Sequence, residues 1–155
     1  MFITNLKTGC FFLLFIFIIQ ISFDVPKKSF AQSEQLKITK PYIKVIGKNA
    51  KSAAGYMVIE NLGGEKITLL EAVGDFAFTM LHTSEEKDGV VSMIHLDNVD
   101  IEKGKKVKFV PGGLHIMFVG ITEDLSKAST KNILLKFKNS ETSFTKTISF
   151  EVKAK

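Results

Sequence analysis

The chain has 155 residues, which suits a single domain, and its 21 basic and 16 acidic residues give a formal net charge of +5. The basic residues are all lysines spread along the chain, without the arginine-containing basic cluster expected of a nucleic-acid-binding protein. The only cysteine is Cys10, so the chain after it has no thiolate for catalysis or metal binding and forms no disulfide.

The first expected element is an export signal. Residues 10–23 form an apolar run that is short for a bilayer span, which needs about 20 residues, and Ser29 and Ala31 offer a cleavage site. This predicts a signal peptide over residues 1–31 and a mature domain over residues 32–155. The long gap before Ala31 leaves an uncleaved membrane anchor as the alternative. Cys10 precedes the apolar run instead of ending it, which argues against a lipid anchor.

Most of the mature region alternates apolar and polar residues with the period of two that is typical of β-strands. The segments expected to be strands are residues 53–61, 66–74, 78–84, 90–96, 105–111, 113–119, 132–139 and 144–154. Turn residues occur at 61–65, 87–89, 102–106 and 111–113. Only residues 123–129 favour a helical turn. Short strands with frequent turns predict an all-β antiparallel sandwich or barrel.

Each histidine of the chain lies two residues from a methionine. The pairs are Met80 with His82, Met93 with His95, and His115 with Met117. Residues i and i+2 of a strand project from the same face, so three strands would each present one imidazole and one thioether together. A single such pair is more often a core methionine and a surface histidine. Three pairs that use every histidine favour a metal site.

The turn at Pro111, Gly112 and Gly113 comes directly before one of these pairs. Proline restricts the backbone and glycine reaches conformations closed to other residues, so the turn is expected to aim the strand that carries His115 and Met117. We expect the site to lie near the end of the sandwich and to be partly exposed, so that a partner protein can reach it.

The ligand types favour monovalent copper. Thioether sulfur is soft and neutral and binds Cu(I) better than Zn(II) or Mg(II), and imidazole binds copper in either oxidation state. A blue-copper electron-transfer site needs a cysteine thiolate, which the mature region lacks. Copper carriage is therefore favoured over electron transfer. The affinity is expected to weaken below about pH 6.5, because only neutral imidazole binds the metal.

Four of these residues also occur at the spacing of a known family. His82, Met93, His115 and Met117 form the pattern H-x10-M-x21-H-x-M. With the flanking segments AAGYMVIENLGG and VKFVPGGLHIMFVGI, this pattern resembles the PCuAC-type periplasmic copper chaperones over residues 38–153. The resemblance implies a cupredoxin-like antiparallel Greek-key β-sandwich in the periplasm. It further implies that one Cu(I) ion is carried on His82, Met93, His115 and Met117, without catalysis.

The resemblance also implies partners. Copper would go to the dinuclear copper centre of cytochrome c oxidase, either directly to the copper-accepting subunit or together with a Sco-type thiol protein. The carrier would be a monomer with no stable membrane insertion after signal cleavage. His95 and Met80 lie outside the family pattern. His95 is interpreted as a surface or hydrogen-bonded histidine, with a backup-ligand role as the alternative, and Met80 could replace a methionine that the family sometimes has where this chain has Thr83.

Three other functions stay open. The chain could be a metal-free exported binding domain, in which the methionines and histidines are incidental. It could be a copper buffer for resistance, with the same site and no delivery partner. An enzyme would need a catalytic set of residues, and neither a Gly-x-Ser-x-Gly elbow nor a phosphate-binding loop occurs in the sequence.

Overall fold

The computed structural model describes residues 35–154. The signal peptide predicted over residues 1–31 lies outside this range, and nearly all of the domain predicted over residues 32–155 lies within it. The described part is all-β apart from one short 3-10 turn inside residues 123–129, so the predicted fold class is confirmed. Within this part, no helix has the length or the hydropathy needed to cross a bilayer.

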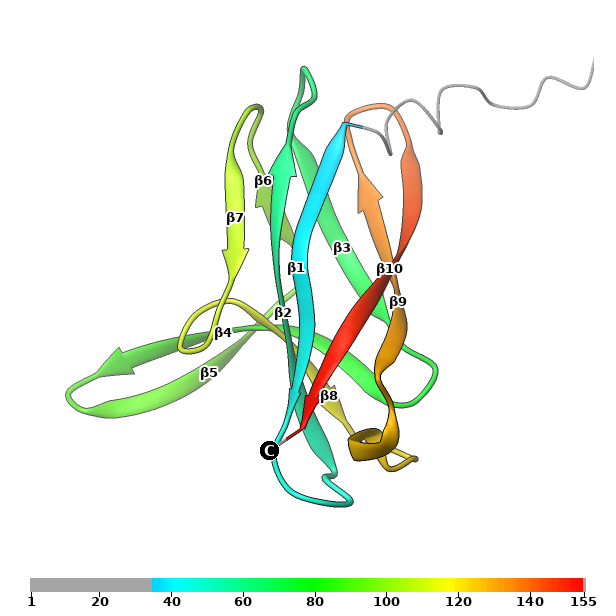
Figure 1. The fold of residues 1–155 in the computed structure, drawn as a ribbon. Coiled ribbons are helices and arrows are strands. Elements are labelled where there is room, and N and C mark those ends of the chain that lie inside the picture. Colours follow the sequence, from blue (N-terminus) through cyan, green and yellow to red (C-terminus); the bar gives the residue numbers. More distant parts are fainter. Residues whose placement is uncertain (1–34, 155) are drawn as a thin grey trace, which may run out of the picture.

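The strands follow one another with short connections (Figure 1). In chain order the elements are β1 (Leu36–Val45), β2 (Ser52–Asn61), β3 (Ile67–Val73), β4 (Phe78–Lys87), β5 (Val90–Leu96), β6 (Val99–Ile101), β7 (Lys106–Phe109), β8 (His115–Val119), η1 (Leu125–Lys127), β9 (Thr130–Lys138) and β10 (Ser143–Ala154). They form one hydrogen-bonded sheet in the order β5-β4-β8-β2-β1-β10-β9-β3-β6, and β7 also pairs with β2. The strand pairs are antiparallel except β1 with β10, so the predicted antiparallel sandwich contains one parallel pair.

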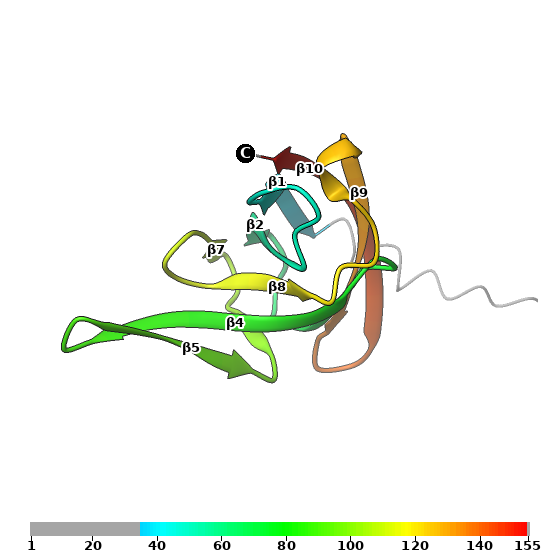
Figure 2. The same cartoon turned by 90° about the horizontal axis from the view of Figure 1, so that it is seen from below.

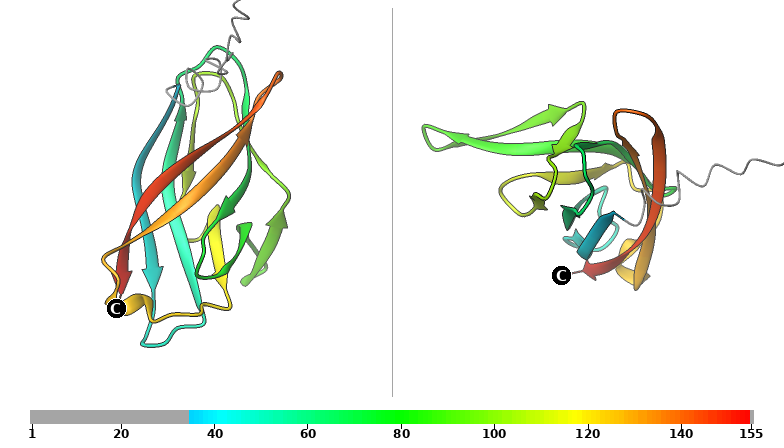
Figure 3. Two further views of the ribbon diagram at one scale, coloured as in Figure 1. Left: turned by 90° about the vertical axis from the view of Figure 1, so that its right-hand side faces the viewer. Right: turned by 90° about the horizontal axis from the view of Figure 1, so that it is seen from above.

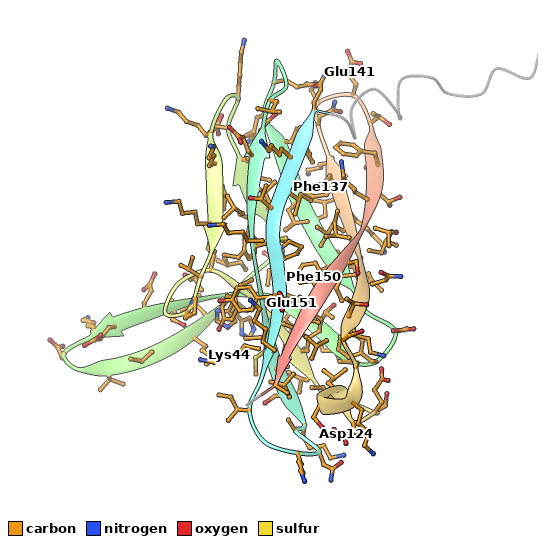
Figure 4. All side chains as sticks on the ribbon, viewed as in Figure 1. Lys44, Asp124, Phe137, Glu141, Phe150 and Glu151 are labelled. Carbon is orange, nitrogen blue, oxygen red and sulfur yellow. The ribbon has the colours of Figure 1, made fainter. Side chains whose placement is uncertain are left out.

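The sheet folds over on itself, so that β9 and β10 cross the face of β1 and β2 (Figure 3). The two halves share one hydrophobic core. Its fully buried members include Ile43, Ile59 and Phe118 from one half and Leu135, Phe137 and Phe150 from the other. Figure 4 shows Phe137 and Phe150 within the body of the molecule. This core makes the body of the sandwich a rigid support for the strands that carry the histidines.

The alternation seen in the sequence corresponds to the two faces of the strands. In β9, Ile133, Leu135 and Phe137 are fully buried, as expected from the period of two. Two strands were missed. In β1 the pair Lys40–Pro41 interrupts the pattern, because Lys40 has a φ of 53° and the pairing with β2 shifts register at this point. The strand β6 has three residues and is too short to show a period.

The hairpin of β4 and β5 extends away from the body of the molecule (Figures 1 and 2). Its two-residue turn is Asp88–Gly89, and both residues have positive φ, as the tight turn of a two-residue hairpin requires. The strand β5 is the edge of the sheet and is exposed along nearly its whole length. The side chains of β5 are therefore exposed to solvent on this projecting hairpin.

Candidate metal centre

All three histidines lie in one row across three neighbouring strands. In the pairing of β4 with β5, His82 is directly opposite His95, and in the pairing of β4 with β8 it is directly opposite His115. Directly opposed residues share a face of the sheet. The ring centroids of His82 and His95 are 5.7 Å apart and those of His82 and His115 are 5.8 Å apart, with both pairs edge to face.

The methionines lie on the same face, on either side of this row. Met80 is directly opposite Met117, one step along the strands from His82 and His115. On the other side of the row, Met93 is opposite Ser84, so it lies diagonally across from His82. The structure therefore gathers the four residues of the H-x10-M-x21-H-x-M pattern on one sheet face, and it adds His95 and Met80 to that face.

The Pro-Gly-Gly turn determines which nitrogen of His115 is available. The carbonyl oxygen of Gly113 lies 2.9 Å from Nδ1 of His115 and also accepts a hydrogen bond from the backbone N–H of Ser84 on β4 at 3.2 Å. A carbonyl oxygen only accepts, so Nδ1 of His115 carries a proton, and in the neutral ring Nε2 is the nitrogen with the lone pair. The turn thus orients the ring and links it to the neighbouring strand, which is the arrangement that metal-binding histidines generally have.

His82 differs from His115 in having an unpartnered nitrogen. Its Nδ1 is buried and makes no hydrogen bond within the described residues. Burial lowers the pKa of His82 below its ordinary value, and the nearby His115 and His95 lower it further. The ring is therefore held in the neutral form that a metal ion needs, with a buried polar atom that a ligand would satisfy.

Exposure increases along the row toward the hairpin. His115 is 4% exposed, His82 is half-buried, and the side chain of His95 is 57% exposed. Met93 is 61% exposed on the same edge strand, whereas Met117 is half-buried. The site lies on a sheet face beside the projecting hairpin, because His82 is in the middle of β4; we expected it near the end of the sandwich.

Two tyrosines continue the row and were not foreseen. Tyr56 on β2 lies next to His115, with ring centroids 6.5 Å apart, and Tyr42 on β1 is paired with Tyr56 at 5.0 Å. Burial raises the pKa of the Tyr56 hydroxyl, and Tyr42 adds to the effect. Tyr56 closes the buried end of the site. No spacing in the sequence signals this contact, because it depends on the register of β2 against β8.

The side chains suit Cu(I) better than a harder ion. Among the described residues, no three His, Cys, Asp or Glu side chains form a ready metal-binding group. A metal bound on this face would therefore need methionine sulfur as well as imidazole nitrogen. Imidazole nitrogen and thioether sulfur together form a soft donor set without anionic ligands, of the kind that Cu(I) favours. The binding of a metal by His82, Met93, His115 and Met117 stays a prediction.

The sequence also resembles known families and proteins. Residues 36–152 match the family described as "LpqE-like: Putative lipoprotein LpqE-like". A curated relative from Leifsonia xyli subsp. xyli, "Putative lipoprotein Lxx21020", is 25% identical over 114 residues, which are 72% of this chain and 68% of the relative.

Solved structures share the fold. The structure described as "Copper-bound PCuAC domain from PmoF2" has a TM-score of 0.62 and 21% identity, and the match covers 78% of this chain and 94% of that one. The structure described as "Apo PCuAC domain from PmoF1" has a TM-score of 0.63 and 19% identity, with 78% and 95% coverage. At these identities the likeness concerns the fold, and the copper belongs to the PmoF2 domain.

Proposed function

We propose, from the membership of the chain in the LpqE-like family, which is the PCuAC family, that it is an exported carrier of one Cu(I) ion. The ligands are His82, Met93, His115 and Met117. The observation that carries the proposal is the row on β4 and β8, in which two imidazoles lie 5.8 Å apart with methionines on either side of the row. Soft, uncharged donors on a sheet held by the core bind Cu(I) without a thiolate.

Copper is the cargo of this site. It binds to Nε2 of His115, whose tautomer the Gly113 carbonyl holds, and to His82, which is neutral because its pKa is lowered. A partner protein takes the ion by ligand exchange, with its own thiolates or imidazoles first replacing a methionine. Met93 is the methionine that a partner reaches first, because it is the most exposed of the four ligands. The protein makes and breaks no covalent bonds of its own, so it is a carrier and not an enzyme.

The identity of the delivery partner is a separate part of the proposal, and it rests on the family resemblance. By resemblance to the PCuAC-type chaperones, copper goes to the copper-accepting subunit of cytochrome c oxidase, with a Sco-type thiol protein as a second partner. The names of the family and of the Leifsonia relative support an exported location. They also point to a lipid anchor, which the position of Cys10 argues against; that segment lies outside the described residues.

An anaerobic Cu(I) titration against a colorimetric competitor tests the binding step. We expect one tight equivalent for the wild type, lost in His115→Ala. Met117→Leu should weaken binding tenfold or more, about 1.4 kcal/mol, because leucine keeps the volume and removes the sulfur. Met57→Leu is the matched control, since Met57 is buried in the core. If none of the four proteins binds Cu(I), the chain is the metal-free binding domain considered above. Equal binding by all four would contradict the proposed ligands, because the ion would then not depend on His115 or Met117.

A deletion strain tests the delivery step. Loss of cytochrome c oxidase activity that added copper restores supports delivery to that enzyme. Copper sensitivity with intact oxidase activity supports the copper buffer instead, with the same ligands but no delivery partner.

A further inference from the structure

The position of His95 next to the copper ligands is explained by neither the family pattern nor the fold. It lies directly opposite His82, with ring centroids 5.7 Å apart, and it shares a strand and a face with Met93. A structural histidine would be expected to have a hydrogen bond to hold it. Within the described residues the ring of His95 has none. The Asp97 carboxylate lies 3.8 Å from its Nε2, within ion-pair distance for a protonated ring but beyond hydrogen-bond distance.

His95 is nevertheless not a preformed ligand of a three-histidine site. No group of three histidine or acidic side chains in the described residues is arranged to hold an ion. His95 and His115 lie on opposite sides of His82, on strands separated by β4. An ion that binds His115 and Met117 at the buried end is thus on the far side of His82 from His95. The row instead provides two overlapping pairs of imidazoles, with His82 in both.

We propose that His95 is a transfer ligand: copper passes between a buried position on His82, Met93, His115 and Met117 and an exposed position on His82, Met93 and His95. This inference rests on the proposed Cu(I) function. In the step toward solvent, a copper–nitrogen bond to His95 forms while the bonds to His115 and Met117 break. All of these ligands stay neutral and no electron moves, so the ion leaves as Cu(I). An acceptor then completes the exchange at the exposed end.

The increase in side-chain exposure along the row favours movement of the ion from the buried position to the exposed one. His115 is nearly buried beside Tyr56, so an acceptor cannot reach an ion there from the side of β2. His95 and Met93 lie on the edge strand of a hairpin that projects from the body, where an acceptor can approach (Figure 2). His82 and Met93 belong to both positions, so the ion stays bound to both throughout and is never released unbound.

The test uses the Cu(I)-loaded protein and bathocuproine disulfonate as the acceptor, mixed without oxygen in a stopped-flow instrument. Loss of the His95-bound intermediate raises the free-energy barrier to copper transfer, but it leaves the free energies of the loaded and unloaded protein unchanged. We therefore expect His95→Ala to slow unloading about tenfold, a barrier increase of about 1.4 kcal/mol. Loading from a Cu(I) donor complex should slow by the same factor, so that the change in Kd is much smaller. His95→Met keeps a soft ligand at this position and should restore most of the rate.

Ser92→Ala is the control, because Ser92 is exposed on the same strand but on the opposite face. Wild-type rates for His95→Ala overturn the proposal. So does a loss of affinity as large as the loss of rate, which would make His95 an ordinary equilibrium ligand. A wild-type protein with no tight Cu(I) equivalent would instead refute the proposed function, and the preceding titration reveals that outcome separately.

Discussion

The three histidines of the proposed site have the same side chain in three different surroundings. The ring of His115 is buried and held by the Gly113 carbonyl, the ring of His82 has a buried nitrogen without a partner, and the ring of His95 is exposed. Burial and neighbouring imidazoles both penalise a positive charge on His82. The metal-free protein therefore keeps His82 neutral at a cost in stability that depends on pH.

This cost gives a prediction for the copper-free protein. The pKa of His82 is lowered in the folded state, so the unfolded chain takes up the proton first as the pH falls through the ordinary value of 6.5. The free energy of unfolding should therefore decrease from about pH 7.5 to about pH 5.5. Urea unfolding at both pH values measures it. The decrease should be smaller in His82→Gln; an equal decrease in both proteins would contradict the lowered pKa.

At the scale of elements, the β4–β5 hairpin determines where Met93 and His95 lie. The edge strand β5 has few core contacts, since nearly all of its residues are exposed. Its position depends on the pairing with β4 and on the turn at Asp88–Gly89. The most exposed part of the proposed site is thus its least supported part, as a segment that exchanges a ligand would require.

A substitution in the turn tests this dependence. Gly89 has a φ of 77°, and a Cβ added there meets nothing within 4 Å, so Gly89→Ala costs backbone strain alone, about 1–2 kcal/mol. We expect the amides of β5 to exchange hydrogen faster and Cu(I) to bind more weakly. Gly47→Ala is the matched control, because it has the same strain, with a φ of 83°, in the β1–β2 connection. Equal Cu(I) affinities in the two variants would show that the hairpin does not support the site.

At the scale of the whole molecule, one hydrophobic core packs between both halves of the folded sheet and fixes the strands that carry the proposed site. The parallel pair of β1 and β10 joins the two halves, and buried side chains from both pack between them. Since β8 contributes Ile116 and Phe118 to this core and His115 and Met117 to the opposite face, the site cannot move independently of the sandwich.

Deleting a core side chain should therefore unfold body and site together. Phe150 is fully buried on β10, three strands from β8 in the sheet, and Phe150→Ala should cost about 3–5 kcal/mol. In chemical unfolding of the Cu(I)-loaded protein, we expect loss of copper and loss of sheet in one transition. Val90→Ala at the exposed hairpin end should change stability by less than about 0.5 kcal/mol. Separate transitions would contradict a single cooperative unit.

Much of the fold could be predicted because it follows from local chemistry. Alternation in β9 and β10 and the turns that separate the strands are properties of adjacent residues, and they indicated an all-β domain. The exceptions have local causes as well. Lys40–Pro41 breaks the period of β1, and β6 is too short to have one.

For the proposed site, the sequence by itself determined which candidate ligand types are present and, through the period of two, that each methionine shares a face with its histidine. Only the tertiary structure decided that His95, His82 and His115 form one row, with Tyr56 closing its buried end. The reason is physical: a strand's own period determines which face a side chain occupies. Its neighbour across the sheet depends on the register between segments far apart in the chain, which the packing of the whole core selects.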